Sequence, residues 1–339
     1  MLKSLKQLYW DFRFGGKHFY SLRNERAERV LEILGIQWRW NRGLSRFEEI
    51  LQFRRFDSDI SLDDQKYYLD CQLKEGAGYT VNWDNPQSFN EKIHWLKLFY
   101  KNPAIQLCAD KYRAYDYVEP RVGALCKQVE RIGVYDSPED IDFSKLPNQF
   151  VLKVNWGSSQ NIICTDKERL DVEKAKQQLS FWMRPQMNQY FSSFEWGYKD
   201  IIPKIICEKY IQELEKSPYI YKIMCFNGKP GIIQFVIDDK KENETINYYD
   251  ANWNLLPFRQ NFPNNPNHFE KPRNLETLLD VAEILSKDFP FVRVDLFDIN
   301  SAVLFSEMTF YSDAGIAPFT PPEWDLKLGQ MIQLPEKWQ

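Results

Sequence analysis

The chain has 339 residues, with 27% charged and 16% aromatic side chains and a formal net charge of −4 at pH 7. This composition excludes a disordered or low-complexity chain, and the negative charge argues against general nucleic-acid binding. A chain of this length can bury a full hydrophobic core, and we expect two or three subdomains in it.

The cysteines and the hydropathy pattern favour a cytoplasmic protein. The six cysteines stand singly, without a CxxC pair or the cysteine–histidine spacing of zinc sites, so we expect reduced thiols. The first segment, MLKSLKQLYWDFRF, lacks the uninterrupted apolar core of a signal peptide. No later segment approaches the roughly 20 apolar residues of a membrane span.

Residues 1–84 are expected to form a mainly helical, basic N-terminal region. Between about Ser21 and Phe56 the apolar residues, Val30 and Leu34 among them, recur at helical spacing. Arginine and aromatic residues are frequent in the same stretch. We favour a helical cap with a solvated basic face. The alternative is peripheral contact with anionic lipid, or with a lipid-linked glycan, at the cytoplasmic face of the inner membrane.

Residues 85–150 are expected to continue as helices. Asn90 is placed to open a helix that ends before Pro103. The next segment, Ile105–Val118, has the pattern of an amphipathic helix, and Lys111 would lie within it.

Residues 151–339 have a different texture, with short β-rich runs separated by Gly, Asn, Pro or charged turns. Helical runs at Asp171–Met183 and Leu275–Lys287 lie between them, so we expect an α+β fold with a substantial antiparallel sheet. The strand-like runs are QFVLKVNW, PKIICEKYI, YIYKIMCF, GIIQFVI, FVRVDLFDI and AVLFSEMTF. No GxGxxG follows a strand and no GxxxxGK[ST] occurs, so neither a Rossmann nor a P-loop phosphate cradle is available.

The strongest chemical signal is FVRVDLFDINSAVLFSEMTF, which predicts two strands joined by a turn at Asp298–Ser301. Alternation places Arg293 and Asp295 on one face of the first strand, and a tight turn would bring Asp295 opposite Glu307. Alternation also groups three residues of the second strand on one face: Phe305, Glu307 and Thr309.

Two converging carboxylates are costly on an apolar sheet unless a cation neutralises them. Hard oxygen ligands of this kind suit Mg²⁺ beside nucleotide phosphates, which indicates an ATP and magnesium site. The alternative is that Asp295 and Glu307 lie on the solvated face of an ordinary antiparallel hairpin.

A second signal is FVLKVNWGSSQN, in which a β run carrying Lys153 leads into a loop of small and amide residues at Asn155–Asn161. Lys153 could reach a phosphate while the N–H groups of the loop close over it. The alternative is an exposed lysine on an edge strand.

The order of several segments resembles the TupA-like ATP-grasp family. These segments are ADKYRAYDYV, FVLKVNWGSSQNII, CEKYI, YKIMCFNGKP, FPFVRVDLFDI and FSEMTFYSDAG. The resemblance extends from about Asn85 to Leu334 and leaves residues 1–84 outside. It implies an ATP-grasp fold, in which two α+β subdomains clamp ATP and a carboxylate is activated as an acyl phosphate for attack by an amine.

The resemblance also implies roles for individual residues. Lys111 and Lys153 resemble the two phosphate-binding lysines, and Arg293 and Lys153 would act in catalysis. A small-residue loop would cover the triphosphate: Gly157, Ser158 and Ser159. The hinge strand would line the adenine site: Glu208, Lys209, Tyr210 and Ile211. Glu213 or, as we prefer, Glu215 would reach the ribose.

Further positions near the end of the chain match the family pattern or depart from it. Lys222 stands in IYK where relatives tend towards DYK, and it resembles another nucleotide-binding lysine. Asp295 and Glu307 resemble the magnesium ligands, with Thr309 at the position where many relatives have asparagine. Past this strand the segment Thr309–Gly315 resembles the loop that receives the acceptor.

The function implied by the resemblance is ligation of a carboxylate, such as that of a uronic acid, to an amino acid or other amine in building bacterial capsule or surface polysaccharide. A sugar kinase is the first alternative, because the same lysines and metal serve transfer to a hydroxyl. A glycosyltransferase, which would need a metal-binding DxD-like triplet such as Asp57–Ser58–Asp59, is less favoured. A binding module without turnover is the remaining alternative.

Overall fold

The computed structural model describes residues 10–14, 17–25, 28–33, 36–41, 46, 50, 60–215, 219–239 and 241–336. The chain divides into two units, Met1–Cys71 and Gln72–Gln339, which are described here separately. Among the described residues, none of the helices combines the length and apolar character needed to cross a membrane.

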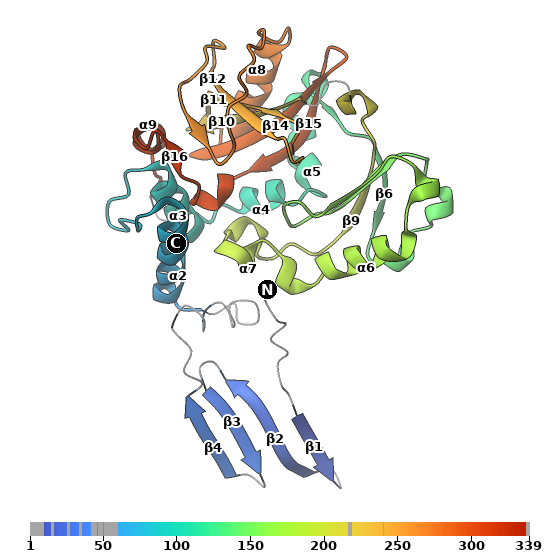
Figure 1. Cartoon of the computed structure of the whole chain (residues 1–339), viewed down its shortest axis with the longest axis vertical. Helices are drawn as coiled ribbons and strands as arrows, with labels where there is room; N and C mark the ends of the chain where they lie inside the picture. Colours follow the sequence, from blue (N-terminus) through green and yellow to red (C-terminus); the bar gives the residue numbers. More distant parts are fainter. Residues whose placement is uncertain are drawn as a thin grey trace. The chain divides into compact units, whose positions relative to one another are not determined.

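The first unit contains a four-stranded antiparallel sheet of β1 (Trp10–Phe14), β2 (Lys17–Glu25), β3 (Glu28–Ile33) and β4 (Ile36–Asn41), in that order (Figure 1). The helical prediction for this stretch was therefore wrong. Apolar residues here also satisfy the two-residue period of a strand, since Leu31 pairs with Trp38 across β3 and β4. Most of the predicted basic surface lies outside the side chains that the structure describes.

The second unit contains a six-stranded sheet, preceded in the chain by the helix α2 (Leu62–Ala77). Its strands run antiparallel except for the last pair, in the order β12 (Thr245–Asp250), β11 (Lys229–Ile237), β10 (Tyr219–Phe226), β14 (Phe291–Ile299), β15 (Ala302–Thr309) and β5 (Lys127–Gln128). One face is covered by α8 (Leu275–Ser286), whose Leu278 and Val281 are fully buried (Figure 1). This packing leaves the other face for the site.

A separate four-stranded antiparallel sheet has the order β6 (Arg131–Tyr135), β9 (Ile205–Lys209), β7 (Phe150–Val154) and β8 (Asn161–Cys164). The helices α6 (Val172–Trp182) and α7 (Tyr190–Ser193) accompany it in the chain (Figure 1). A two-stranded ribbon of β13 (Arg259–Gln260) and β16 (Phe319–Thr320) leads to α9 (Glu323–Met331). The expected α+β architecture with two sheets is confirmed.

The helix predicted to begin at Asn90 begins one residue earlier. It is α3 (Phe89–Phe99), and Ser88 caps it, with its hydroxyl accepting a hydrogen bond from the Glu91 N–H and the Glu91 carboxylate accepting one from the Ser88 N–H. Asn90 donates instead to Ala317 O, at 2.9 Å. This contact ties α3 to the segment that follows β15.

Lys111 does not lie within a helix, as the sequence pattern predicted. The segment splits into α4 (Pro103–Ala109) and α5 (Ala114–Val122), with Lys111 in the turn between them. The break arises because the Asp110 carboxylate accepts a hydrogen bond from the Tyr112 N–H, at 2.8 Å, which competes with helical pairing. The turn frees Lys111 to face the site.

The β14–β15 hairpin has the expected tight turn. Asn300 and Ser301 both have positive φ, 51° and 63°, as the two-residue hairpin turn requires, and Asp295 pairs with Glu307. The prediction that Phe305 shares a face with Glu307 was wrong. A β-bulge at Ser306 shifts the register, so Phe305 pairs with Leu296 and both are buried.

Candidate active site

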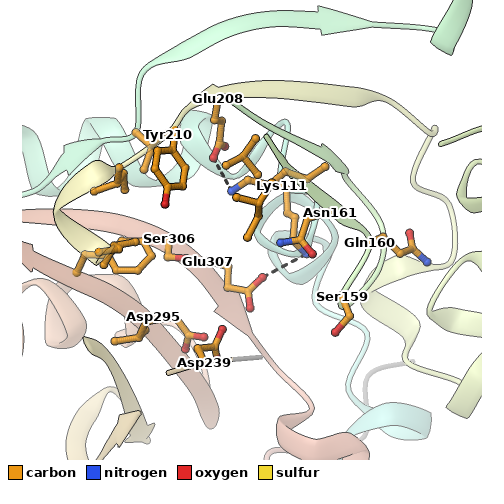
Figure 2. A pocket seen from close by; sticks show the side chains of 18 of the residues that line it. Lys111, Ser159, Gln160, Asn161, Glu208, Tyr210, Asp239, Asp295, Ser306 and Glu307 are labelled. Atoms are coloured by element: carbon orange, nitrogen blue, oxygen red, sulfur yellow. Dashed lines mark ion pairs between the residues drawn. The ribbon is translucent and has the colours of Figure 1, made fainter. Parts of the chain in front are cut away.

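A cavity of about 470 Å³ lies between the two sheets of the second unit (Figure 2). Most of the site residues predicted from the sequence line it: Lys111, Lys153, Gly157, Ser158, Ser159, Glu208, Lys209, Tyr210, Ile211, Glu215, Lys222, Asp295 and Glu307. Arg293 and Thr309 are not part of the lining. Because the bulge inserts one residue, Ser306 and Glu307 both face the cavity.

Lys153 and Glu208 form an ion pair on the four-stranded sheet. Lys153 is on β7 and Glu208 on the neighbouring strand β9, and the lysine Nζ lies 2.5 Å from the carboxylate Oε2. Glu208 is 5% exposed, so this pair is shielded from solvent. It holds the lysine side chain at the cavity wall.

Lys111 links the two sides of the cavity. Its Nζ donates a hydrogen bond to the Gly157 carbonyl, at 2.9 Å, in the small-residue loop. The same atom lies 3.2 Å from Oε2 of Glu307 on the six-stranded sheet (Figure 2). The predicted phosphate lysine and the predicted metal carboxylate therefore meet in one place.

Asn155 is buried and holds the Lys111 turn in position. Its side-chain amide donates to the Asp110 carboxylate, at 2.8 Å, and to the Ile202 carbonyl, at 3.0 Å, and its oxygen accepts the Lys204 N–H, at 2.8 Å. The Lys111 N–H in turn donates to the Asn155 carbonyl, at 3.2 Å. Sequence reasoning placed Asn155 in a phosphate loop and missed this role.

We expect Asn155→Ala to lower the free energy of unfolding by about 2–3 kcal/mol, because it leaves the buried Asp110 carboxylate and two backbone groups without these partners. Urea denaturation followed by circular dichroism measures the change. Ser158→Ala, in the exposed part of the same loop, is the control and should stay within about 0.5 kcal/mol of wild type. Equal stability of the two variants would contradict this role.

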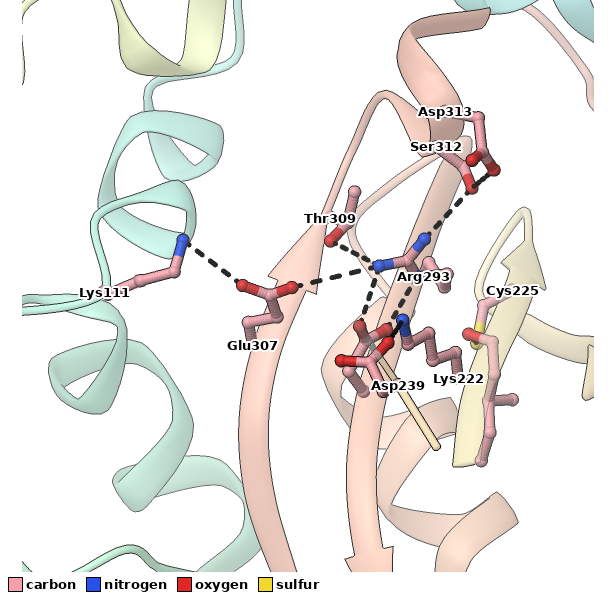
Figure 3. Close-up of polar contacts among 11 residues, drawn as sticks. Lys111, Lys222, Cys225, Asp239, Arg293, Glu307, Thr309, Ser312 and Asp313 are labelled. Carbon is pink, nitrogen blue, oxygen red and sulfur yellow. Dashed lines mark hydrogen bonds and ion pairs between the residues drawn. The ribbon is translucent and has the colours of Figure 1, made fainter. Parts of the chain in front are cut away.

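Arg293, which contacts Thr309 and Ser312 in Figure 3, forms a fork on Asp295 of the cavity lining. Its Nε and Nη2 donate to the two carboxylate oxygens at 2.7 and 2.8 Å, and further donations reach Thr309 Oγ1, at 3.2 Å, and Ser312 Oγ, at 3.3 Å. Burial pulls the pKa of Arg293 down, but the charge of Asp295 outweighs it and the net pKa is raised. The guanidinium is therefore a fixed positive charge.

The donor set of Asp295 and Glu307 fits one Mg²⁺ shared with nucleotide phosphates. These two carboxylates are cross-strand partners at the cavity wall. In the part of the chain that the structure describes, no group of three or more His, Cys, Asp or Glu side chains could hold a metal by itself. Mg²⁺ in nucleotide sites uses one or two carboxylates, with phosphates and water completing its shell. Thr309 as a third ligand stays a prediction.

Lys222 forms an ion pair that the sequence did not reveal. Its Nζ lies 2.7 Å from Oδ1 of Asp239, and both residues line the cavity (Figure 3). Burial and the nearby Arg293 lower the pKa of Lys222, yet the charges of Asp239 and Asp295 prevail and raise it. Lys222 therefore remains protonated at the wall.

The remaining lining suits a base and a sugar. Apolar residues make up part of the lining: Val129, Val151, Ile163, Ile211, Leu214, Ile220 and Phe297. The Tyr210 hydroxyl donates to Glu215, at 2.9 Å, and both residues line the cavity. Glu213 instead accepts a hydrogen bond from Asn300 and is outside the lining, which favours Glu215 of the two candidates for the ribose.

The loop after β15 has an unusual backbone. Asp313, Ala314 and Gly315 all have positive φ, at 48°, 51° and 64°. Such a conformation persists only where surroundings fix it. Asn261 donates to Asp313, at 3.0 Å, and the ammonium of Lys97 donates to the Ala314 carbonyl, at 2.7 Å. The candidate acceptor residues Ser312 and Asp313 are thereby held next to Arg293.

Lys97 is only 1% exposed, and burial lowers its pKa to about 8, while the charge of Glu195 partly opposes this shift. The unfolded chain therefore binds this proton more tightly, and between pH 8 and 10.5 the contribution of Lys97 to stability should rise with pH. We expect the unfolding free energy of wild type minus that of Lys97→Met to increase by at most about 1.4 kcal/mol per pH unit in this window. Urea titrations at several pH values measure it, and parallel curves would contradict it.

The family model described as TupA-like ATPgrasp matches residues 91–333. A search of curated proteins found no match.

Three solved structures show a weak likeness. The D-alanine–D-alanine ligase of Bacillus anthracis complexed with ATP has 15% identity over 79% of this chain and 82% of that chain, with a TM-score of 0.37. The phosphoribosylamine–glycine ligase of Thermotoga maritima has 13% identity over 68% and 51%, with a TM-score of 0.38, so this chain spans about half of its length. The D-cycloserine synthetase DcsG has 11% identity over 85% and 94%, with a TM-score of 0.38.

Proposed function

Because the chain belongs to the TupA-like ATP-grasp family, we propose that it is an ATP-dependent ligase that joins a carboxylate to an amine. The family match covers both sheets and the cavity between them, and the fold is the ATP-grasp fold. The observation that carries the proposal is the meeting of Lys111 with Glu307, at 3.2 Å, across this cavity. It joins the proposed phosphate-binding cation and the proposed metal-binding anion in one site.

The basic side chains of the cavity would hold ATP. Lys111, Lys153 and Lys222 each have a carboxylate partner in the structure, at 3.2, 2.5 and 2.7 Å. An ammonium has three donors, so phosphate oxygens of ATP would be bound alongside these carboxylate partners. The apolar residues of the cavity lining and Tyr210 would take the base.

Mg²⁺ bound by Asp295 and Glu307 would neutralise charge that develops on the transferring phosphoryl group. Arg293 holds Asp295 through two hydrogen bonds and keeps its own positive charge directly beneath the cavity. Lys153 and Lys222 add positive charge at the wall. These residues act by positioning and by charge, and none forms a bond with the substrate.

The proposed ligation has two steps. A carboxylate oxygen attacks the γ-phosphorus of ATP and ADP leaves, which gives an acyl phosphate. The amine nitrogen then attacks the acyl carbon, inorganic phosphate leaves and the nitrogen loses a proton. Ser312 and Asp313, held beside Arg293, are the proposed contacts of the acceptor.

The substrates that we propose are a uronic acid or other saccharide carboxylate and an amino acid, in the building of capsule or surface polysaccharide. The family resemblance of the sequence supports this proposal. Contact of the basic N-terminal region with the inner membrane or a lipid-linked glycan is part of the same proposal. It is supported by the arginine-rich sequence of that region.

Product analysis with the full chain tests the proposal. The protein is incubated with Mg²⁺-ATP and a panel of uronic-acid saccharides and amino acids, and phosphorus NMR follows the products. A ligase releases ADP and free inorganic phosphate only when a carboxylate and an amine are both present. Phosphate that remains covalently attached to the saccharide would show a kinase and refute ligation.

A further inference from the structure

Lys222 has two neighbouring carboxylates, Asp239 and Asp295, and forms an ion pair with Asp239. Its cross-strand partner on β14 is Asp295, directly opposite in the register of β10 and β14. The ammonium nevertheless pairs with Asp239, at 2.7 Å, in the turn after β11 (Figure 3). The side chains of Lys222 and Asp239 are 14% and 15% exposed, so this ion pair is largely shielded from water.

Asp295 still has unused acceptor capacity on the cavity side. An ionised carboxylate offers about four lone-pair positions, and the Arg293 fork uses one on each oxygen. The remaining positions are those that a nucleotide-bound Mg²⁺ would need. A lysine released from Asp239 would find the same positions, because a buried ammonium requires a partner.

The turn after β11 fixes the position of Asp239. β11 ends at Ile237, and Asp238 takes a φ of 58°, which bends the chain back. The Asp238 carboxylate accepts hydrogen bonds from Lys241 Nζ and Asn243 Nδ2, both at 2.7 Å. The Lys241 N–H also donates to the Asp238 carbonyl, at 2.9 Å.

We propose that Asp239 is a positioning residue, which holds the Lys222 ammonium at the cavity wall and so leaves the outer lone pairs of Asp295 available to the nucleotide-bound divalent ion. This inference rests on the proposed function for the existence of that ion. Asp239 itself does not bind the metal. By holding the Lys222 ammonium, it leaves Asp295 to the divalent ion.

The test measures Mn²⁺ binding to the full-length protein at saturating ADP, by electron paramagnetic resonance of free Mn²⁺. We expect Asp239→Asn to weaken Mn²⁺ binding by about 10-fold or more, as is usual when a group that supports a metal ligand is lost. The double variant Asp239→Asn with Lys222→Met should return to within about threefold of wild type, because the competing ammonium is gone.

A matched control separates the explanations. Glu242→Gln removes the same charge from the same turn, but Glu242 is exposed and outside the cavity lining, so its Mn²⁺ affinity should stay near wild type. Equal weakening in Glu242→Gln and Asp239→Asn would reduce the effect to general electrostatics and overturn the inference. Failure of the double variant to recover, with an unchanged melting temperature, would also overturn it.

The outcome distinguishes this inference from the function on which it rests. If the wild type binds no Mn²⁺ in the presence of ADP, both are overturned. If the wild type binds Mn²⁺ and Asp239→Asn binds it equally well, the inference about Asp239 fails while the proposed metal site stands.

Discussion

Replacement of Glu307 by glutamine is expected to lower the rate of ADP formation by about 10²–10³-fold, the usual cost of removing one preorganised charge-stabilising group. Glutamine keeps the shape of the side chain but has no negative charge for Mg²⁺ or for Lys111, which lies 3.2 Å away. The bulge at Ser306 turns this side chain into the cavity. Because β15 has no other carboxylate, no neighbour on the strand can replace it. A coupled assay for ADP measures the rate, at saturating Mg²⁺-ATP and with the carboxylate and amine that the product analysis identifies.

Glu213→Gln is the matched control for this experiment. Glu213 lies outside the cavity lining and accepts a hydrogen bond from Asn300, so the variant should keep at least half of the wild-type rate. Circular dichroism establishes that both variants are folded. A Glu307→Gln enzyme with the rate of wild type would remove Glu307 from the mechanism.

Replacement of Arg293 by methionine is expected to destabilise the protein by about 3–5 kcal/mol, because it leaves Asp295 charged and buried without its fork. Asp295 is 2% exposed and accepts both of the short bonds that Arg293 makes, at 2.7 and 2.8 Å. Thr309 and Ser312 lose a donor at the same time. Guanidinium unfolding measures the loss.

The double variant Arg293→Met with Asp295→Leu should recover most of that stability and yet remain inactive. It replaces the buried ion pair by apolar groups, which in other proteins is often neutral or stabilising. A double variant as unstable as the single one would show that the loss does not come from an unpaired charge. Recovery of activity would exclude Asp295 from the metal site.

Much of the site follows from local sequence patterns. The run FVRVDLFDI has a strand's composition and Asp298–Ser301 has a turn's, so the pairing of Asp295 with Glu307 could be predicted from the hairpin alone. Lys153 followed by a glycine-serine loop predicted a phosphate contact. That the two segments belong to one site was implied by the family resemblance, since contacts between distant segments leave no period in the sequence.

The errors have identifiable physical causes. A bulge changes the alternation by one residue and leaves no signal in composition, so Phe305 was assigned to the wrong face. Asp110 stops a helix through a side-chain bond that competes with helical pairing, which placed Lys111 in a turn. In residues 10–41 apolar positions fit both helical and strand periods, and the structure shows strands.

Asn155, Lys97 and Asp239 were not assigned their structural roles because each acts through a tertiary partner. Asn155 reaches Asp110, and Lys97 reaches Ala314, more than two hundred positions further along the chain. Asp239 reaches Lys222 across a turn bent by the positive φ of Asp238. The local sequence around a polar residue does not identify its hydrogen-bond partner in a distant segment.

The most direct measurement is a crystal structure of the protein with a non-hydrolysable ATP analogue and Mn²⁺, whose anomalous scattering locates the ion. We predict the phosphates between Lys111, Lys153 and Lys222, and the ion within coordination distance of both Asp295 and Glu307. An analogue bound elsewhere, or an ion that contacts neither carboxylate, would contradict the account.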